Sequence, residues 1–590
     1  MQSFLLSINA LTTFVIIFNV ALCLLNIINV KKYLHIFQLK DYSSFRYIKH
    51  IFKKQIYYIL TNIFLLILNL LIKNEILLLI SAIVLLIINF LFNYKLIETN
   101  KTPIKYTKKF IRLLILSILL IIVVSFIPKS ILYINLFTII VPILSIFLNV
   151  YDIIKNKYYI NKAKEKLRLN KTKVIAITGS NGKTSVKNIL EKMLSKKYKV
   201  CATPKSYNTP LGIAKFINED LNNDCDYLIL EYGARRRGDI KKLCKLFGAD
   251  FGIITTVAPQ HLETFKTIEN VFKEKRELSK FLSSGCCVFN LDNLHTYRMF
   301  EQRENNKIGV SIYQKCDIYA EKIKIKNFLT HFNLHIYNKS YQVETCLLGR
   351  HNVLNILLAT ALAKKLNIED SDIIDTIKNL QFVPHRLELI KSNIYILDDS
   401  YNCSLISAKE SINVLNEISK DLKRVEKRLN KKTNLGLDNY NLIKSNSNAN
   451  LEKNFKFLKN STKNDEKIAK ISEKTKNLKN FSNILNESNV NTDNQNKKFK
   501  RVICTPGIIE GGKFEYVLNL KLGKLCAKSD EVIIVGEYNK NAIYSGLKSS
   551  NYIDENIIFC KTLENAKEYF KHLSSGDILL LLNDLPDDYK

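Results

Sequence analysis

A short glycine-rich stretch, Gly179-Ser180-Asn181-Gly182-Lys183-Thr184-Ser185, has the residue types and spacing that bind phosphate groups. The apolar run Val174–Thr178 precedes it, and a helical apolar pattern that starts at Val186 follows it. A strand, a glycine turn and a helix N-terminus direct backbone N–H groups toward an anion. Lys183 is then placed to neutralise phosphate oxygens, and the Thr184 hydroxyl to hold Mg²⁺. We therefore predict a nucleotide site here, in preference to an ordinary strand–helix turn.

Further polar residues stand where predicted elements begin or end. Glu231 ends the apolar run Tyr227–Glu231, and a carboxylate at a strand end suits a Mg²⁺ ligand. His261 follows the run Phe251–Thr256 and is a second metal-ligand candidate. Taken singly, an ordinary strand-end glutamate is an equally good interpretation of Glu231, and an ordinary loop histidine is the better interpretation of His261.

A second group of polar residues suits the base and the phosphates of a nucleotide. Asn352 and Asn355 are three residues apart in a predicted helix, so their amides share one face and can meet adenine. Arg386 and Asp399 lie at a predicted domain junction and the strand end after it. An arginine at such a junction can grip a phosphate with two hydrogen bonds.

The order of these stretches across residues 172–590 resembles the Mur ligase family of ATP-dependent amide-forming enzymes. The short loop Thr-Gly-x-x-Gly-Lys-Thr, which ends at Thr184, carries the resemblance, and two later stretches refine it. Asp398-Asp399-Ser400-Tyr401-Asn402 and Asn583-Asp584-Leu585-Pro586-Asp587 favour the branch that joins D-alanyl-D-alanine to a UDP-linked muramoyl tripeptide. The resemblance implies ATP and Mg²⁺, a central ATP-binding α/β domain and a C-terminal Rossmann-like α/β domain.

The resemblance also implies site residues, with Lys183, Lys275 and His261 as the catalytic set. The ATP-binding residues it implies are Gly179, Ser180, Asn181, Gly182, Lys183, Thr184, Ser185, Asn352, Asn355, Arg386 and Asp399. The metal-binding residues are Thr184, Glu231, His261 and a carbamylated Lys275, and the substrate-binding residues are Asn208, Thr209, Arg235, Tyr401 and Asn402. Two positions depart from the family pattern: Arg276 follows Lys275 where glycine is usual, and Cys403-Ser404-Leu405 replaces Ala-Asn-Pro.

The N-terminal quarter of the chain is apolar and predicts about five membrane-spanning helices. The runs are Phe4–Val30, Ile56–Ile72, Ile76–Phe92, Leu113–Ile127 and Ile131–Val150. The intervening segments 31–54 and 94–112 are rich in Lys and Arg, so the positive-inside bias places them in the cytoplasm. We expect a multi-pass protein of the bacterial inner (cytoplasmic) membrane, with the lipid bilayer as a partner and the catalytic domains in the cytoplasm.

Length and composition bound the remaining organisation. The 590 residues predict a membrane region at 1–152, a linker at 153–171, a central domain at 172–385 and a C-terminal domain at 386–590. An Asn- and Lys-rich tract at about 421–500 interrupts the last domain, and its composition predicts disorder. The net charge of +34 is not gathered in one stripe, which argues against nucleic acid, and the 12 scattered cysteines predict reduced thiols.

Three alternatives stay open at this stage. The first is a membrane-anchored ligase of the same type that acts on a different carboxylate, such as a lipid-linked one, and the predicted membrane region motivates it. The family's UDP-sugar domain also has no recognisable counterpart here. The second is an NTP-driven transporter, which the scarcity of ionisable residues in the apolar runs disfavours. The third is a catalytically silent scaffold, which the joint presence of Lys183, Thr184, Glu231 and His261 disfavours.

Overall fold

The computed structural model describes residues 137–433 and 499–583, apart from seven single positions, together with residues 104, 106–125 and parts of 27–48. The seven positions are 205, 206, 223, 283, 402, 510 and 511. Contacts divide the chain into two units, with the boundary between Tyr158 and Tyr159. The domain limits predicted at 152, 171 and 385 stay predictions.

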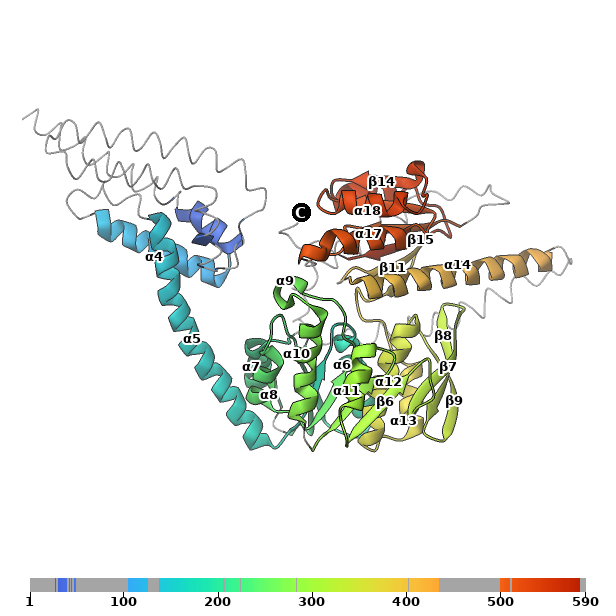
Figure 1. The fold of residues 1–590 in the computed structure, drawn as a ribbon, viewed down its shortest axis with the longest axis horizontal. Helices are drawn as coiled ribbons and strands as arrows, with labels where there is room; N and C mark the ends of the chain where they lie inside the picture. Colours follow the sequence, from blue (N-terminus) through green and yellow to red (C-terminus); the bar gives the residue numbers. More distant parts are fainter. Residues whose placement is uncertain are drawn as a thin grey trace, which may run out of the picture. The chain divides into compact units, whose positions relative to one another are not determined.

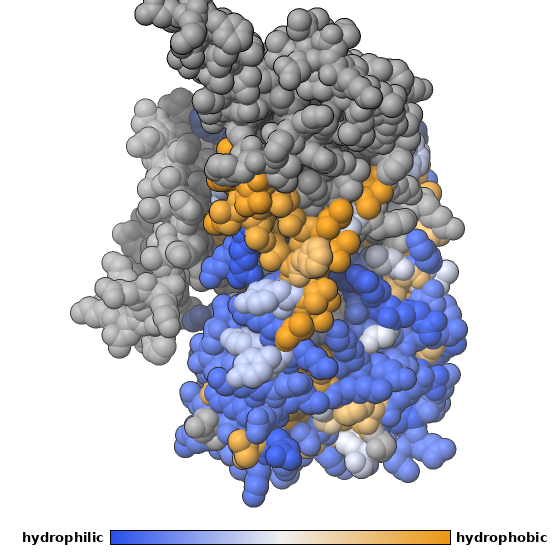
Figure 2. All heavy atoms as spheres, turned by 90° about the vertical axis from the view of Figure 1, so that its left-hand side faces the viewer, coloured by the Kyte–Doolittle hydropathy of each residue, from blue (hydrophilic) through white to orange (hydrophobic). Residues whose placement is uncertain are grey.

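In the first unit, helix α4 (Lys108–Ser125) and the first part of helix α5 (Phe137–Asn170) expose apolar side chains, which Figure 2 shows gathered on one face. Polar contacts also join these helices: the Lys109 Nζ donates to Asn149 Oδ1 at 2.8 Å, and Arg112 pairs with Asp152 at 3.4 Å. The predicted end of the membrane region at residue 152 falls inside the continuous 34-residue helix α5.

The predicted inner-membrane location is wrong. Within the part of the chain that the structure describes, no helix combines the length and the apolar character that a bilayer crossing requires. Helix α4 illustrates the reason, because three cations, Lys108, Lys109 and Arg112, leave too few apolar residues among its 18 for a span of about 20. The predicted runs Ile56–Ile72 and Ile76–Phe92, and nearly all of Phe4–Val30, lie outside the described residues.

The second unit contains a nine-stranded sheet in the order β2-β3-β1-β4-β5-β6-β7-β8-β9, which confirms the predicted α/β class (Figure 1). Strands β1 to β7 pair in parallel, and the β7-β8-β9 end is antiparallel. Continuous apolar runs form the inner parallel strands because both faces of these strands are buried. The strands are β1 (Lys173–Thr178), β2 (Val200–Ala202), β3 (Tyr227–Glu231), β4 (Phe251–Ile254), β5 (Cys286–Asn290), β6 (Lys307–Ser311), β7 (Ile318–Lys326), β8 (Leu329–Ile336) and β9 (Lys339–Thr345).

Helices cover both faces of this sheet with apolar side chains. One face carries α6 (Lys183–Leu194), α12 (Arg350–Lys365) and α13 (Asp370–Lys378). The other carries α7 (Pro210–Glu219), α8 (Asp239–Phe247), α10 (Ile268–Phe281) and α11 (Leu294–Glu301), and the short α9 (Leu262–Phe265) precedes α10. The carboxyl ends of β1, β3 and β4 meet at one edge, where α6 begins.

A six-stranded sheet follows in the order β10-β11-β15-β12-β13-β14, with only β10 antiparallel. Its strands are β10 (Glu388–Lys391), β11 (Tyr395–Asp399), β12 (Arg501–Thr505), β13 (Glu531–Val535), β14 (Ile557–Cys560) and β15 (Ile578–Leu582). Its helices are α14 (Leu405–Thr433), α17 (Glu515–Cys526), α18 (Lys540–Lys548) and α19 (Leu563–Phe570), with the short turns η3 (Gly512–Phe514) and η4 (Asp554–Asn556). Helices α14, α17 and α18 pack on one face of the sheet, and α19 packs on the other.

The Asn- and Lys-rich tract begins later than predicted. Helix α14 continues to Thr433, and Asp421, at the expected start of the tract, is buried because its carboxylate accepts a hydrogen bond from the Asn327 backbone at 2.6 Å. The apolar Leu422 beside it is buried as well. The remainder of the tract, residues 434–498, lies outside the described residues.

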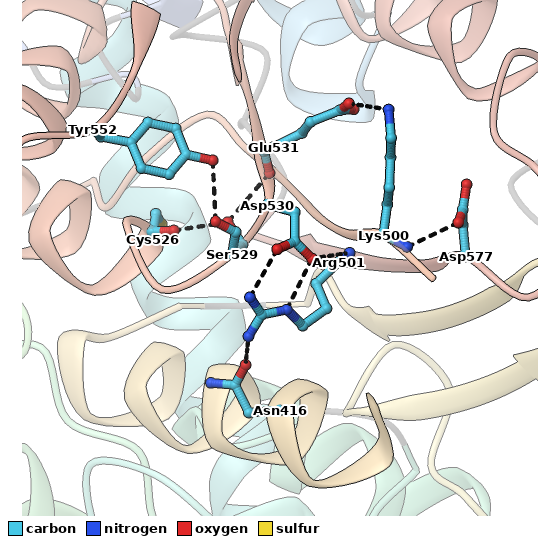
Figure 3. Close-up of polar contacts among 9 residues, drawn as sticks. All are labelled: Asn416, Lys500, Arg501, Cys526, Ser529, Asp530, Glu531, Tyr552 and Asp577. Carbon is cyan, nitrogen blue, oxygen red and sulfur yellow. Dashed lines mark hydrogen bonds and ion pairs between the residues drawn. The ribbon is translucent and has the colours of Figure 1, made fainter. Parts of the chain in front are cut away.

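A polar cluster joins the two ends of this tract (Figure 3). The Arg501 guanidinium donates two hydrogen bonds of 2.9 Å to the Asp530 carboxylate and a third, of 2.6 Å, to Asn416 on α14. Next to it, Lys500 Nζ donates to Glu531 at 2.6 Å. The helix before the tract and the strand after it are therefore fastened to each other directly.

This arrangement predicts that the fold survives removal of residues 428–496. The helix from Asn416 to residue 427 covers about 16 Å, and a flexible linker of about ten residues averages roughly 17 Å. We expect calorimetry to give an unfolding free energy within about 1 kcal/mol of the full chain, because each doubling of loop length costs only about 0.6 kcal/mol. In the same background, Asp530→Ala removes the arginine's partner and lowers stability by about 1–3 kcal/mol. Loss of cooperative unfolding in the deletion alone would contradict this account.

Candidate active site

Two glycines shape the turn between β1 and α6. Gly179 has φ +149° and Gly182, the N-cap of α6, has φ +85°, a conformation that glycine adopts without strain. A Cβ at Gly179 would lie 1.9 Å from the Thr255 hydroxyl, and one at Gly182 would lie 2.5 Å from Asn355 Oδ1. Close packing from two sides therefore requires glycine at both positions.

The residues between these glycines are fastened to the segment after β4. The Ser180 backbone N–H donates to the Thr256 carbonyl at 2.7 Å, and the Ser180 hydroxyl exchanges hydrogen bonds with the Ala258 backbone at 3.0 and 3.1 Å. The Asn181 N–H donates to the Thr256 hydroxyl at 3.1 Å, and its carbonyl accepts from Thr255 at 2.5 Å. These hydrogen bonds hold the loop in a fixed cradle shape, and its role as a phosphate site stays a prediction.

Lys183 folds back over this cradle. Its Nζ donates to the Gly179 carbonyl at 2.6 Å and to the Ser180 carbonyl at 3.3 Å. Burial lowers the pKa of Lys183 to about 8, with Glu231 opposing and Arg386 adding to the shift. The ammonium lies at the position where a bound phosphate would replace these carbonyls as its partner.

Thr184 and Glu231 meet at the end of the adjacent strands. The Thr184 hydroxyl donates to Glu231 Oε2 at 3.1 Å, and Arg386 donates to the same hydroxyl at 3.3 Å. Glu231 is 1% exposed. The structure therefore brings three predicted residues into a single cluster: Glu231 from strand β3, Thr184 from helix α6 and Arg386 from the junction that follows.

Lys187 completes this cluster and is absent from the sequence prediction. Its Nζ lies 3.0 Å from Glu231 Oε1 and donates to the Thr203 carbonyl at 2.5 Å, with both charged side chains almost fully buried. The sequence does indicate its position, because Lys187 lies four residues after Lys183 and therefore on the same face of α6. The spacing alone, however, does not distinguish Lys187 from an ordinary lysine of an amphipathic helix.

Lys275 on α10 is buried, as its predicted role requires. Burial, together with the charge of Lys183, lowers its pKa to about 7, while Glu274 and Asp239 oppose the shift. The neighbouring Glu274 points elsewhere and accepts hydrogen bonds from the Gly238 and Ile240 backbone at 2.6 Å each. Lys275 is thus an amine that is largely neutral near pH 8, close to the phosphate cradle.

Asn352 and Asn355 lie on the buried face of α12, as predicted. The Asn355 amide donates to Asn352 Oδ1 at 3.3 Å, and the Asn352 amide donates to the Leu348 carbonyl at 2.9 Å. A small hollow beside them is walled by both apolar and polar groups. It is lined by Ser185, Asn188, Ile189, Lys192, Leu347, Asn352, Leu380, Gln381, Val383 and Arg386. Asn188 and Lys192 were missed by the sequence prediction.

Arg386 lies on the segment that leads into the second sheet, and Asp399 ends strand β11 within that sheet. Burial raises the pKa of Asp399 to about 6, although a 2.6 Å hydrogen bond from Ser411 and the Arg386 charge oppose the shift. The Arg386 guanidinium stacks 4.2 Å over the Tyr401 ring. Tyr401, a predicted substrate residue, thus holds the arginine in place, and Asn402 lies outside the described residues.

The other predicted substrate residues lie on loops beside β3. The Asn208 carbonyl accepts from Gly233 N–H at 3.1 Å, and the Thr209 side chain caps helix α7 by accepting from Gly212 N–H. Arg235 is exposed, and its backbone N–H donates to Asp239 at 2.9 Å. Their placement leaves Arg235 open to an anionic ligand, whereas Thr209 has a structural role.

His261 is the N-cap of α9, with a left-handed backbone at φ +50°. It follows β4, so it lies toward the carboxyl edge of the sheet that also carries Glu231. Among the described residues, no three or more His, Cys, Asp or Glu side chains gather as a metal site. The Thr184 hydroxyl and the Glu231 carboxylate nevertheless offer oxygen donors that fit Mg²⁺, which binds few protein groups alongside phosphate oxygens. The metal roles of Glu231 and His261 stay predictions.

A glycine cradle at the carboxyl edge of a parallel sheet is the arrangement with which many α/β proteins bind phosphate groups. Residues 177–363 match the model of the Mur ligase middle domain. The fold agrees: solved MurF structures from Acinetobacter baumannii and Thermotoga maritima give TM-scores of 0.52 and 0.54 at 20% identity. These alignments cover 72% and 73% of this chain and 77% and 80% of the solved chains. The Thermotoga structure contains ADP.

Two curated relatives are named UDP-N-acetylmuramoyl-tripeptide–D-alanyl-D-alanine ligase. The protein of Buchnera aphidicola (subsp. Baizongia pistaciae) is 32% identical over 250 residues, and that of Escherichia coli K12 is 31% identical over 252 residues. Each match covers 42% of this chain and 54% or 55% of the relative. The chain therefore spans about half the length of the curated relatives it matches.

The close packing at Gly182 predicts that an added Cβ lowers the stability of the fold by more than backbone strain alone would. Gly182→Ala adds left-handed strain of about 1–2 kcal/mol and a clash with Asn355 worth about 1–3 kcal/mol. Gly238→Ala is the matched control, because its φ is +92° and nothing lies within 4 Å of an added Cβ. Denaturant unfolding measures both. Equal losses of stability in the two variants would show that Asn355 does not clash with a side chain at position 182.

Proposed function

We propose that this chain is an ATP-dependent ligase that joins D-alanyl-D-alanine to a UDP-N-acetylmuramoyl tripeptide. The observation that carries the proposal is the single cluster formed by the phosphate cradle, Thr184, Glu231 and Arg386, in which Arg386 lies 3.3 Å from the Thr184 hydroxyl. The names of the curated relatives support the choice of substrates.

ATP fits this cluster with its base and its phosphates in different places. The base would lie in the hollow beside Asn352, and the phosphates would extend to the cradle, where Lys183 exchanges its carbonyl partners for phosphate oxygens. Bound Mg²⁺ would supply a Lewis acid for the terminal phosphate. Thr184 and Glu231 would hold that ion through oxygen donors.

The reaction that this site supports has two steps. A substrate carboxylate oxygen attacks the γ-phosphorus, ADP leaves, and an acyl phosphate forms. The D-alanyl amine then attacks the acyl carbon and loses a proton, and inorganic phosphate leaves with the bridging oxygen. Lys183 and Arg386 contribute by stabilising negative charge on the transferring phosphoryl group in a water-poor site.

Lys275 would act as a carbamate, the modification that the family resemblance implies. Carbamylation requires a neutral amine, and burial with the charge of Lys183 lowers the Lys275 pKa to about 7. Reaction with CO₂ would convert the Lys275 side chain, which as an ammonium would repel Mg²⁺, into an anionic oxygen ligand. The side chain therefore gains a favourable interaction with Lys183 and with a bound cation.

The proposal is tested by ADP release from the full chain. ATP turnover should require the UDP-linked tripeptide and D-alanyl-D-alanine together, and the product should contain both. Turnover that ignores D-alanyl-D-alanine would overturn the ligase assignment. Turnover with a different carboxylate in place of the tripeptide would retain a ligase but reject the proposed substrate.

Lys183→Ala removes the cation that faces the transferring phosphate. We expect kcat to fall about 100-fold or more, because one lost electrostatic stabiliser costs about 10²–10³. Melting curves should stay close to wild type, since the ammonium contacts only loop carbonyls. Lys196→Ala is the control, as it removes an exposed ion pair with Asp375 just beyond the same helix. Near-normal turnover by Lys183→Ala would reject the phosphate-cradle assignment.

Lys275→Ala should impair ligation strongly, and a short-chain carboxylic acid should restore part of the rate by occupying the vacated space. A ¹³C carbamate signal from ¹³CO₂ should be present in wild type and absent from the variant. Lys273→Ala is the control, because residues two apart do not share a helix face. Damage from Lys273→Ala with little from Lys275→Ala would place the predicted carbamate on the wrong residue.

A further inference from the structure

Lys187 is a buried cation that the proposed reaction does not use. Its side chain is 2% exposed, and its charge lies on the far side of Glu231 from the Thr184 hydroxyl. A lysine is rarely buried unless its charge is paired. Its presence at the centre of the cluster therefore requires a specific partner.

The two oxygens of Glu231 have different surroundings. Oε2 accepts the Thr184 hydroxyl, whereas Oε1 lies 3.0 Å from Lys187 Nζ and accepts no aligned hydrogen bond from the described residues. The lysine instead directs its shortest hydrogen bond, 2.5 Å, to the Thr203 carbonyl. Lys187 is thus held by the backbone after β2 and attracts Oε1 by charge.

We propose that Lys187 is a positioning residue that fixes the Glu231 carboxylate, so that Oε2 faces Thr184 and a bound divalent cation. The proposal rests on the proposed ATP-dependent function, because it assigns Mg²⁺–nucleotide to this site. Lys187 acts on the cation only through Glu231. It also joins the metal ligand to the start of the loop that carries Asn208, since Thr203 begins that loop.

The physical reason for a lysine here is the cost of an isolated buried carboxylate. A buried charge that loses its partner is strongly destabilised, so the side chain moves toward water. That movement turns the oxygen away from the cation. Removing Lys187 should therefore weaken the gain in nucleotide affinity that Mg²⁺ provides. The affinity without Mg²⁺ should change little, because the cradle and the hollow provide it.

The test measures ADP affinity by calorimetry in the full chain, across a series of Mg²⁺ concentrations and without Mg²⁺. In Lys187→Met, we expect the half-saturating Mg²⁺ concentration to rise about tenfold or more, while Mg²⁺-free affinity changes less than about threefold. Lys187→Arg should recover much of the Mg²⁺ dependence, because it keeps the charge. Lys199→Met is the control, because it removes an exposed ion pair with Asp224.

Each outcome decides between the proposals. Equal loss of affinity with and without Mg²⁺, an unchanged Mg²⁺ response, or tighter Mg²⁺ binding in Lys187→Met would overturn the positioning role. Should Lys187→Met fail to fold, Lys187→Gln replaces it, because its amide can still donate to the Thr203 carbonyl but carries no charge to attract Oε1, and the same difference between Mg²⁺-dependent and Mg²⁺-free affinity is required. Absence of Mg²⁺-dependent ADP binding in the wild type would instead reject the proposed function.

Discussion

The buried carboxylate of Glu231 is the constraint on which the rest of the site depends. Strand register places it, since β1 and β3 pair in parallel with Ile177 opposite Glu231, two residues before the glycine cradle begins. A slip of one residue would turn the carboxylate to the other face of the sheet. Lys187 and Thr184 then approach it from α6, so one strand pair and one helix fix the whole cluster.

The second sheet contributes through the segment that precedes it. Arg386 reaches the Thr184 hydroxyl, and Ser404, at the start of α14, accepts a hydrogen bond of 3.2 Å from the Asn181 amide. His385 and Leu387, on either side of the arginine, have left-handed backbones at φ +62° and +52°. Such strain in non-glycine residues persists where the surroundings impose it, often at functional sites. The junction thus holds Arg386 in a defined place.

Local patterns predicted most of the framework. The predicted runs Val174–Thr178 and Tyr227–Glu231 form β1 and β3. A short apolar, β-branched run bounded by a turn is typical of a buried strand in an α/β protein. The glycine cradle followed from residue type alone. The buried state of Lys187 did not, because periodicity gives the face of a helix but not the partner across it.

The predicted inner-membrane location failed for a related reason. The apolar run Leu113–Ile127 was counted by itself, but in the structure helix α4 begins at Lys108 and includes Lys109 and Arg112 in its first turns. Likewise, the predicted break at Asp421 rested on composition, whereas a single hydrogen bond from the Asn327 backbone keeps that aspartate buried. Tertiary partners of charged residues are the information that one sequence lacks.

The central claim is that the cluster around Glu231 activates a carboxylate by phosphoryl transfer. It is tested most directly by ligation with a UDP-linked tripeptide whose terminal carboxylate carries ¹⁸O, followed by mass spectrometry of the released phosphate. An acyl phosphate requires one carboxylate oxygen to leave with the phosphate, so the account predicts a single ¹⁸O in each phosphate formed. Phosphate without ¹⁸O, formed while the amide accumulates, would contradict it.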